Sequence, residues 1–145
     1  MMFMHKNGSN NFFAFVFLFF SLILLDQGAK QLATNIFLNG NFAFSLSLPL
    51  WLMYVIYFVV ICWLIYYFGK NFYKISFVSR LAFILILAGA FSNVGERLVF
   101  GHVRDFIFIT LGGLTGIYNL ADGYIILGII LLLCYGLTTK DQELK

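Results

Sequence analysis

Charged side chains are scarce in this sequence. Asp, Glu, Lys and Arg make up 10% of its 145 residues, whereas hydrophobic residues make up 62%. A soluble domain carries about 25% charged residues. The chain therefore lacks the charge needed to cover a water-facing surface, and we expect most of its surface to face lipid. Its length suffices for one compact domain over residues 1–145 and leaves no room for a second.

Cysteine and histidine are also scarce, with two residues of each. Cys62 and Cys134 stand inside apolar runs, so both are interpreted as small buried hydrophobic residues and not as a disulfide or metal pair. His5 and His102 are too few and too far apart for a set of metal ligands. The sequence contains no HExxH motif and no phosphate-binding glycine loop. It therefore predicts no metal and no cofactor.

Long apolar segments are abundant. A helix crosses the hydrocarbon core in about 20 residues, and four segments qualify, at about 11–29, 50–68, 77–95 and 119–137. The sequence therefore predicts an all-α integral membrane protein with four transmembrane helices. The first segment ends in DQGAK, which offers no small-x-small cleavage site, so we expect an uncleaved helix and not a removed signal peptide.

Lysine and arginine are unevenly distributed between the two sides of these helices. With four crossings, both termini share one side with Lys6, Lys70, Lys74, Arg80, Lys140 and Lys145. The opposite side holds Lys30, Arg97 and Arg104. This imbalance follows the positive-inside rule if both termini are cytoplasmic. The basic residues at the cytoplasmic ends are then topology signals and contacts to anionic lipid, and the net charge of +3 requires no nucleic-acid partner. On the opposite side, Arg97 and Arg104 could extend to lipid headgroups.

The two segments expected on the extracytoplasmic side differ from ordinary loops. Residues 31–49 contain the turn-forming pair Asn39-Gly40 and then alternating apolar residues from Phe42 to Leu48, a pattern typical of a strand or hairpin. Residues 98–118 lack a full helical pattern and contain Gly112-Gly113. We therefore expect a small β-like segment on the extracytoplasmic membrane surface.

Polar residues gather at the outer ends of the predicted helices. Asp26 and Lys30 are four residues apart and share a helical face, so they form either a structural ion pair or a pair that fixes the first helix against an active site. Asn93 and Arg97 have the same spacing. Asn93 alone is compatible with helix association, and the small residues of 89–92 would let a neighbouring helix approach closely.

Two aspartates on this side could perform acid–base chemistry together. Asn119 is expected to cap a helix, which places Asp122 at the third helical position, where the helix dipole favours its charge. Taken alone, Asp122 is more typical of a cap than of a catalyst. Asp105 stands directly before an apolar segment. If Asp105 and Asp122 lie close together, the two carboxylates favour a state in which one is protonated and the other ionised. Which aspartate is the base stays open, although the helix N-terminus favours Asp122.

A second class of function uses the same acids differently. Asp26, Asp105 and Asp122 could be proton or cation sites of a small transporter or channel subunit. Such proteins often place their acids near the bilayer midplane and contain a sequence repeat. Here the acids cluster at one outer level without a repeat, which favours the catalytic interpretation.

Five short motifs occur in a recognisable order: DQGAK (26–30), NGNFAFS (39–45), GAFSNVGER (89–97), VRDF (103–106) and YNLAD (118–122). Their order and their positions at helix ends resemble the lipoprotein signal peptidase (signal peptidase II) family. The resemblance implies a metal-independent aspartic endopeptidase of the bacterial plasma membrane. It also implies cleavage of diacylglyceryl-modified prolipoproteins before the lipidated cysteine, contact with membrane lipid, and inhibition by globomycin-type cyclic peptides.

The resemblance also implies roles for individual residues. The catalytic pair would be Asp105 and Asp122. The supporting or substrate-binding residues would be Asp26, Lys30, Asn39, Asn93, Arg97 and Asn119.

The sequence departs from the family pattern in three places. Glu96 stands where the family usually has aspartate, Asn41 and Phe42 replace small residues, and the segment between DQGAK and NGNFAFS is shorter than usual. A catalytically inactive relative that binds lipoproteins without cutting them is therefore a further alternative.

Overall fold

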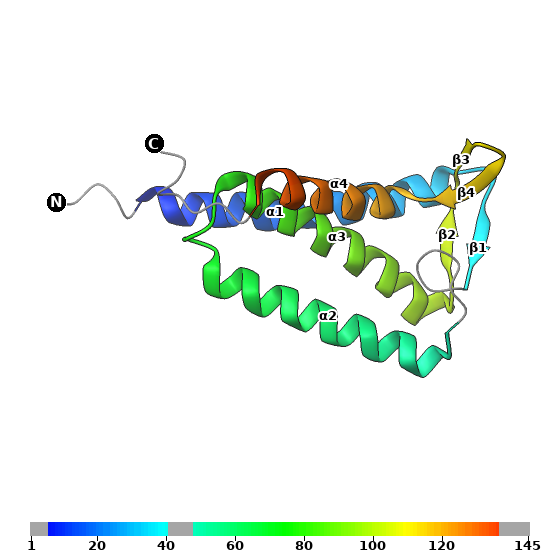
Figure 1. The fold of residues 1–145 in the computed structure, drawn as a ribbon, viewed down its shortest axis with the longest axis horizontal. Coiled ribbons are helices and arrows are strands. Elements are labelled where there is room, and N and C mark those ends of the chain that lie inside the picture. Colours follow the sequence, from blue (N-terminus) through cyan, green and yellow to red (C-terminus); the bar gives the residue numbers. More distant parts are fainter. Residues whose placement is uncertain (1–5, 41–47, 137–145) are drawn as a thin grey trace.

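The computed structural model describes residues 6–40 and 48–136, which form four helices and four short strands (Figure 1). The helices are α1 (Lys6–Leu32), α2 (Leu50–Asn71), α3 (Phe77–Phe100) and α4 (Leu120–Tyr135). The strands are β1 (Phe37–Asn39), β2 (Val103–Asp105), β3 (Ile107–Leu111) and β4 (Leu114–Tyr118). The helices extend along the long axis of the molecule, and all the strands of the described part lie at one end of it.

Three of the helices are long and apolar enough to cross a membrane, namely α1, α2 and α3. The fourth, α4, has 16 residues. At 1.5 Å per residue it is about 24 Å long, somewhat less than the hydrocarbon core of about 30 Å. The chain is thus mostly helical with three helices of spanning length, and α4 is shorter than the segment 119–137 predicted from the sequence.

The central helix of the bundle is α3, which lies between α2 and the pair α1 and α4 in Figure 1. Its approach to α4 depends on glycine, because a Cβ atom at Gly89 would overlap the carbonyl oxygen of Ala121. A Cβ atom at Gly128 would likewise lie 2.7 Å from the carbonyl oxygen of Ala82. The sequence prediction that small residues near 89–92 permit close helix packing is confirmed.

The core at the end opposite the strands is aromatic. Phe15 and Phe72 pack with Ile84 and fix the start of α1 against the end of α2 and the start of α3. The guanidinium of Arg80 lies 5.6 Å and 5.4 Å from the ring centroids of Phe15 and Phe72. Ser76 caps α3 there by accepting the backbone N–H of Ser79 at 3.1 Å. This packing joins α1, α2 and α3 at the end of the bundle opposite the strands.

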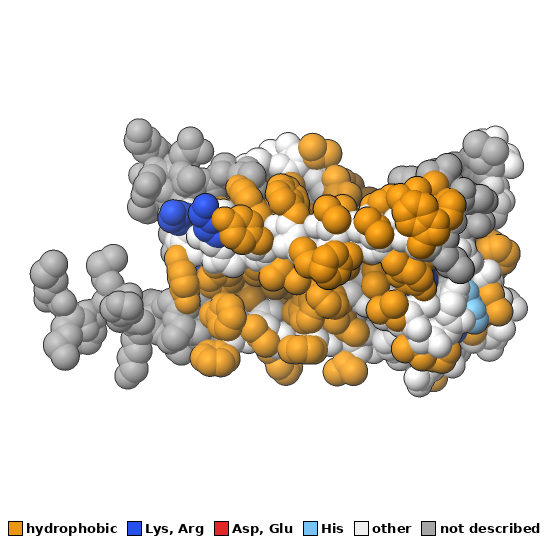
Figure 2. Space-filling model, turned by 90° about the horizontal axis from the view of Figure 1, so that it is seen from below, with side chains coloured by type: hydrophobic (Ala, Val, Ile, Leu, Met, Phe, Trp, Pro, Cys, Tyr) orange, Lys and Arg blue, Asp and Glu red, His pale blue; other side chains and the backbone are white. Residues whose placement is uncertain are grey.

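Hydrophobic side chains cover most of the face shown in Figure 2, with Lys and Arg gathered near the end where α2 leads into α3. Such a surface suits lipid and not water. Cys62 and Cys134 are both exposed on helix surfaces, so the prediction that they are buried was wrong. An apolar run in a membrane helix contains both core-facing and lipid-facing positions, and the run alone does not distinguish them.

The helix α3 continues to Phe100, beyond the predicted end near residue 95. It ends at Gly101, whose φ of 76° is left-handed and whose N–H donates to the carbonyl of Arg97 at 3.0 Å. Glycine adopts this conformation without the steric cost of a side chain. As a result, both Glu96 and Arg97 belong to the last turns of a helix.

Two antiparallel strand pairs follow at this end. β1 pairs with β2 so that Phe37 is opposite Asp105 and Asn39 is opposite Val103. β3 and β4 form a hairpin that turns at Gly112 and Gly113, with φ values of 56° and 85°, the positive values that a tight hairpin turn requires. The strand predicted over Phe42 to Leu48 falls largely on 41–47, which lie outside the described residues.

Candidate active site

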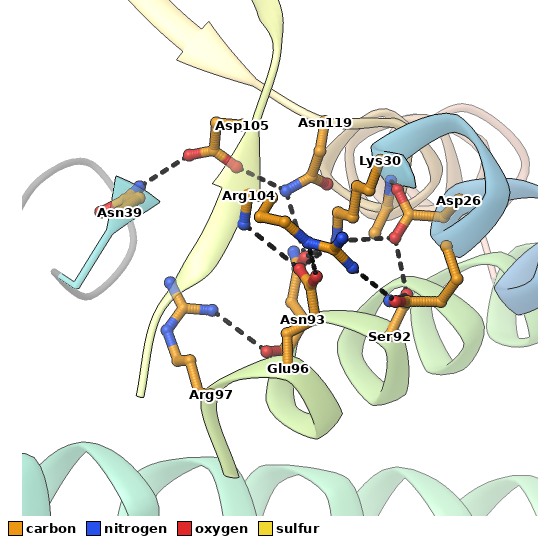
Figure 3. A network of polar contacts seen from close by, with 12 residues as sticks. Asp26, Lys30, Asn39, Ser92, Asn93, Glu96, Arg97, Arg104, Asp105 and Asn119 are labelled. Atoms are coloured by element: carbon orange, nitrogen blue, oxygen red, sulfur yellow. Dashed lines mark hydrogen bonds and ion pairs between the residues drawn. The ribbon is translucent and has the colours of Figure 1, made fainter. Parts of the chain in front are cut away.

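The polar residues singled out in the sequence come together at the strand end of the bundle (Figure 3). They derive from five separate elements: Asp26 and Lys30 from α1, Asn39 from β1, Asn93 and Arg97 from α3, Asp105 from β2, and Asp122 from α4, with Asn119 directly before α4. Residues that are distant in the sequence therefore share one buried cluster. The site is assembled by tertiary packing, and its chemistry depends on how these elements meet.

A buried ion-pair chain forms the floor of the cluster. The Lys30 ammonium lies 2.7 Å from an Asp26 carboxylate oxygen and 2.8 Å from a Glu96 carboxylate oxygen. Asp26 and Lys30 are fully buried, and Glu96 is nearly so. The predicted pairing of Asp26 with Lys30 is confirmed. Two carboxylates around one buried ammonium compensate part of the desolvation that each charge suffers on its own.

Asp26 also connects α1 to the start of α4. One carboxylate oxygen accepts the backbone N–H of Ala121 at 3.0 Å, and the other accepts the Ser92 hydroxyl at 2.6 Å. The N–H groups of a helix's first turn have no partner inside the helix. Asp26 supplies one of these partners from a different helix, and it thereby fixes where α4 begins.

The start of α4 is a capping box. The Asn119 side chain accepts the N–H of Asp122 at 2.9 Å, and the Asp122 carboxylate accepts the N–H of Asn119 at 3.1 Å. The predicted cap is therefore confirmed. The same bonds fix the Asp122 carboxylate at the mouth of the helix.

The two aspartates are joined through side-chain amides. Asn119 Nδ2 donates to Asp105 Oδ1 at 2.6 Å and to Asn93 Oδ1 at 3.1 Å. Asn93 Nδ2 then donates to Asp122 Oδ1 at 2.8 Å. On the other side, Asn39 Nδ2 donates to Asp105 Oδ2 at 2.9 Å. Each carboxylate is therefore oriented by two donors.

Lys30 fixes the direction of this amide chain. Its ammonium donates to Asn93 Oδ1 at 3.1 Å. An ammonium group is only a donor, so it requires the oxygen and not the nitrogen of the amide. The Asn93 nitrogen is consequently left to face Asp122.

The Asp105 carboxyl is buried on the strand side of the cluster, with 2% of the residue exposed. This burial raises the pKa of Asp105 above its ordinary value. The amide donors Asn39 and Asn119, together with the positive charges of Lys30 and Arg97, act against that rise in pKa. Burial favours the neutral form of a carboxyl, and donors and cations favour the charged form.

Two cavities meet at this cluster. One of about 390 Å³ is lined by both Asp105 and Asp122 and by apolar side chains of α4. The other, of about 310 Å³, lies between α2, α3 and α4 and is mostly apolar. Asn93, Arg97 and Asp122 line both cavities. A bound molecule could therefore contact the carboxylates and a long apolar surface at once.

The sequence profile described as "Signal peptidase (SPase) II" matches residues 31–138 of the chain. The chain belongs to the signal peptidase II family. The match begins at the last two residues of α1 and covers α2, α3, α4 and the strands, so it includes the whole cluster except Asp26 and Lys30.

Curated relatives named lipoprotein signal peptidase support the same family. The protein from Fusobacterium nucleatum is 29% identical over 138 residues, covering 82% of this chain and 83% of its own. The protein from Bartonella tribocorum is 35% identical, covering 70% of this chain and 62% of its own. The protein from Chlamydia muridarum is 36% identical, covering 72% and 64%.

The fold is also found in solved structures. A bacterial membrane enzyme determined by the in meso method at 2.3 Å resolution matches with a TM-score of 0.73 and 23% identity. The match covers 84% of this chain and 86% of that one. A second such structure, at 1.9 Å resolution, matches with a TM-score of 0.69 and 22% identity. These likenesses concern the fold, that is, the arrangement of the helices and strands.

Within this member of the signal peptidase II family, Glu96 and Arg104 complete the network. Arg104 Nε donates to Glu96 Oε1 at 2.6 Å, and Arg104 Nη2 donates to Gln27 Oε1 at 3.3 Å. The sequence suggested that Arg104 was a lipid contact. The structure instead places it in an ion pair with Glu96. No local spacing predicts this pair, because the two residues lie on different elements.

Proposed function

We propose that this chain is a membrane aspartic endopeptidase that cleaves the signal peptide of diacylglyceryl-modified prolipoproteins before the lipidated cysteine. The observation that supports this proposal most strongly is that Asp105 and Asp122 line one cavity and are joined through Asn93 and Asn119. The printed names of the curated relatives support the class of substrate.

The charges of the cluster favour one shared proton. Four carboxylates belong to it: Asp26, Glu96, Asp105 and Asp122. Three cations accompany them: Lys30, Arg97 and Arg104. With all four carboxylates ionised, the cluster carries one excess negative charge in a poorly solvated place. A proton on one aspartate of the pair removes that excess, and it leaves one acid and one base, as acid–base catalysis requires.

The surroundings suggest which aspartate holds the proton. Asp122 lies in the first turn of α4 and accepts the backbone N–H of Asn119, and a helix N-terminus stabilises negative charge. Asp105 is buried with 2% exposed, whereas Asp122 is only partly buried, so burial favours the neutral form more strongly at Asp105. We therefore assign Asp122 as the initial base and Asp105 as the initial acid. The two groups titrate as a coupled pair.

In the proposed reaction, the Asp122 carboxylate accepts a proton from water while the water oxygen attacks the scissile carbonyl carbon. The Asp105 carboxyl donates a hydrogen bond to the carbonyl oxygen as negative charge develops there. When the tetrahedral intermediate collapses, the peptide C–N bond breaks and the leaving nitrogen receives a proton from the pair. The products are a new carboxylate on the signal peptide and a free amine on the lipidated cysteine.

The two cavities would accommodate different parts of the substrate. The scissile peptide would enter the 390 Å³ cavity between the aspartates. The diacylglyceryl chains would remain in the bilayer beside the apolar 310 Å³ cavity between α2 and α4. Globomycin-type cyclic peptides would compete for the same space.

We propose that the protein is a multi-pass protein of the bacterial plasma membrane with both termini in the cytoplasm. α4 would provide a fourth crossing, since local thinning of the bilayer accommodates a short helix at modest cost. The cluster would then lie near the extracytoplasmic face, where water reaches the aspartates. Residues 1–145 would form a single domain.

The direct test is cleavage of a diacylglyceryl-modified prolipoprotein by the purified protein in detergent or lipid. Asp105→Asn and Asp122→Asn should each abolish turnover, because neither amide can exchange the required proton. Ser79→Ala is the matched control, since Ser79 Oγ donates to the Gly136 carbonyl at 3.2 Å at the far end of the bundle. This control should keep wild-type turnover.

Several outcomes would refute the proposal. Substantial cleavage by either aspartate variant would exclude the pair as the catalytic group. Loss of activity with a chelator would indicate a metal enzyme. Binding of the substrate by the wild-type protein without cleavage would support an inactive relative.

A further inference from the structure

Glu96 holds the residue that precedes Asp105 through both its side chain and its backbone. Glu96 Oε1 accepts Arg104 Nε at 2.6 Å, and Glu96 Oε2 accepts the backbone N–H of Arg104 at 3.2 Å. The same Oε2 atom lies 2.8 Å from the Lys30 ammonium. Two N–H groups of Arg104 thus donate to the Glu96 carboxylate. Because charge-assisted hydrogen bonds are short and directional, they fix the orientation of Arg104 as well as its distance from Glu96.

The strand that carries Asp105 has little other support. β2 has three residues and pairs only with β1 among the described strands, and a short two-stranded pairing is marginally stable by itself. Leu38 is the partner of Arg104 in this pairing. The hydrogen bond from the Arg104 N–H to Glu96 anchors β2 to α3, the central helix of the bundle (Figure 1).

Successive side chains of a strand point to opposite sides. Arg104 faces Glu96 and Gln27, whereas Asp105 faces Asn39 and Asn119 (Figure 3). A rotation of β2 that released Arg104 would also turn the Asp105 carboxyl away from the amides. The strand therefore couples the orientation of the Arg104 side chain to that of the Asp105 side chain.

We propose that Glu96 is a positioning residue for the reaction, acting through Arg104 to aim the Asp105 carboxyl into the cavity that it shares with Asp122. This inference rests on the proposed function, in which Asp105 reacts with the substrate. Glu96 itself does not line either cavity around the aspartates. It acts on the orientation of Asp105 through the strand.

The test uses Glu96→Gln, which keeps the length of the side chain and removes its charge. A misplacement of a reacting group by about 1 Å costs on the order of 10²-fold in rate. We therefore expect kcat to fall by between about tenfold and about 10²-fold, with KM within about twofold. The control is Ser79→Ala, which also removes a buried polar contact but far from β2.

Two further measurements separate positioning from a general loss of stability. Arg104→Gln should lower kcat in the same way. The double variant with Glu96→Gln should have a kcat only slightly lower than that of either single variant, because both substitutions break the same interaction between Glu96 and Arg104. Hydrogen–deuterium exchange of residues 103–106 should be faster in Glu96→Gln than in the wild-type protein, while exchange in α4 stays the same.

Wild-type kcat in Glu96→Gln, additive effects of the two substitutions, or unchanged exchange of residues 103–106 would each contradict a positioning role of Glu96. Absence of cleavage by the wild-type protein would refute the proposed function instead. The exchange measurement does not use turnover, so in that event it still decides whether Glu96 holds β2.

Discussion

The side-chain amide of Asn119 donates to the Asp105 carboxylate at 2.6 Å and also accepts the backbone N–H of Asp122 at 2.9 Å. One residue therefore begins α4 and reaches both aspartates of the proposed pair. The geometry couples the position of a helix end to the distance and orientation of two carboxylates. It also offers a way to separate the two roles by mutation.

Asn119→Ser should preserve the helix and impair the chemistry. Serine caps helices about as well as asparagine, whereas alanine at this position costs roughly 0.5–2 kcal/mol of stability. Neither replacement can donate an amide hydrogen bond to Asp105, and a typical hydrogen bond contributes about 0.5–1.5 kcal/mol. Thermal unfolding should therefore distinguish Asn119→Ser from Asn119→Ala, and cleavage assays should show turnover lowered by up to about tenfold in both. A serine variant with wild-type kcat would contradict the proposed role of the amide.

Lys30→Met should destabilise the protein by about 3–5 kcal/mol, because it leaves buried carboxylates without their shared cation. Adding Asp26→Asn to this variant should recover part of the loss by removing one of those charges. Denaturant unfolding in detergent, followed by tryptophan fluorescence, measures both effects. If the double variant is no more stable than Lys30→Met alone, the ion pair is not the source of the destabilisation.

Gly89→Ala should displace the start of α4, since the added methyl group would overlap the Ala121 carbonyl oxygen. Overpacking of this kind typically costs about 1–3 kcal/mol. Gly95→Ala on the same helix is the matched control, because a Cβ atom there meets nothing within 4 Å and alanine favours a helix by about 0.5–1 kcal/mol. Unfolding temperatures should therefore move in opposite directions for the two variants. Equal shifts would show that helix propensity, and not the approach of α4, governs both positions.

Asp105→Asn should become more stable relative to the wild-type protein as the pH rises. Burial raises the pKa of Asp105 in the folded state, whereas in the unfolded chain an aspartate titrates near about 3.9. The folded state thus binds this proton more tightly, and ionising the group costs stability. The cost is absent below about pH 3.9 and is fully present above the raised folded-state pKa of Asp105. Asparagine does not titrate, so it removes this dependence.

The measurement is the difference in unfolding temperature between the two proteins across a pH series that begins near the unfolded-state value. A constant difference would show that burial does not shift the titration of Asp105. A difference of the opposite slope would show that the donors and cations around Asp105 outweigh its burial.

The parts of the site that the sequence predicted are those set by spacing along one helix. The pairing of Asp26 with Lys30 and the cap formed by Asn119 and Asp122 each involve residues three or four positions apart. At such separations the helix itself fixes the geometry. These contacts could therefore be inferred before the neighbouring elements were known.

The contacts that the sequence did not predict cross between elements. Asn39 meets Asp105 and Ser92 meets Asp26 although each pair is separated by 66 residues. Arg104 was assigned to lipid because its only visible property was a positive charge near a helix end. The exposed positions of the cysteines were missed for a different reason, since the lipid-facing and core-facing sides of a membrane helix are equally apolar.

The capping box at α4 has a mechanical consequence for the proposed cycle. The Asp122 oxygens that would collect a proton from water are the same ones that accept the N–H of Asn119 and the amide of Asn93. Each time this carboxylate is neutralised, its attraction for those two donors and for the helix end weakens, and it strengthens again when the proton leaves. The first turn of α4 would therefore loosen and tighten once in every turnover. Product release and the return of the site to its starting state would then both depend on the Asp122 carboxylate and its two donors.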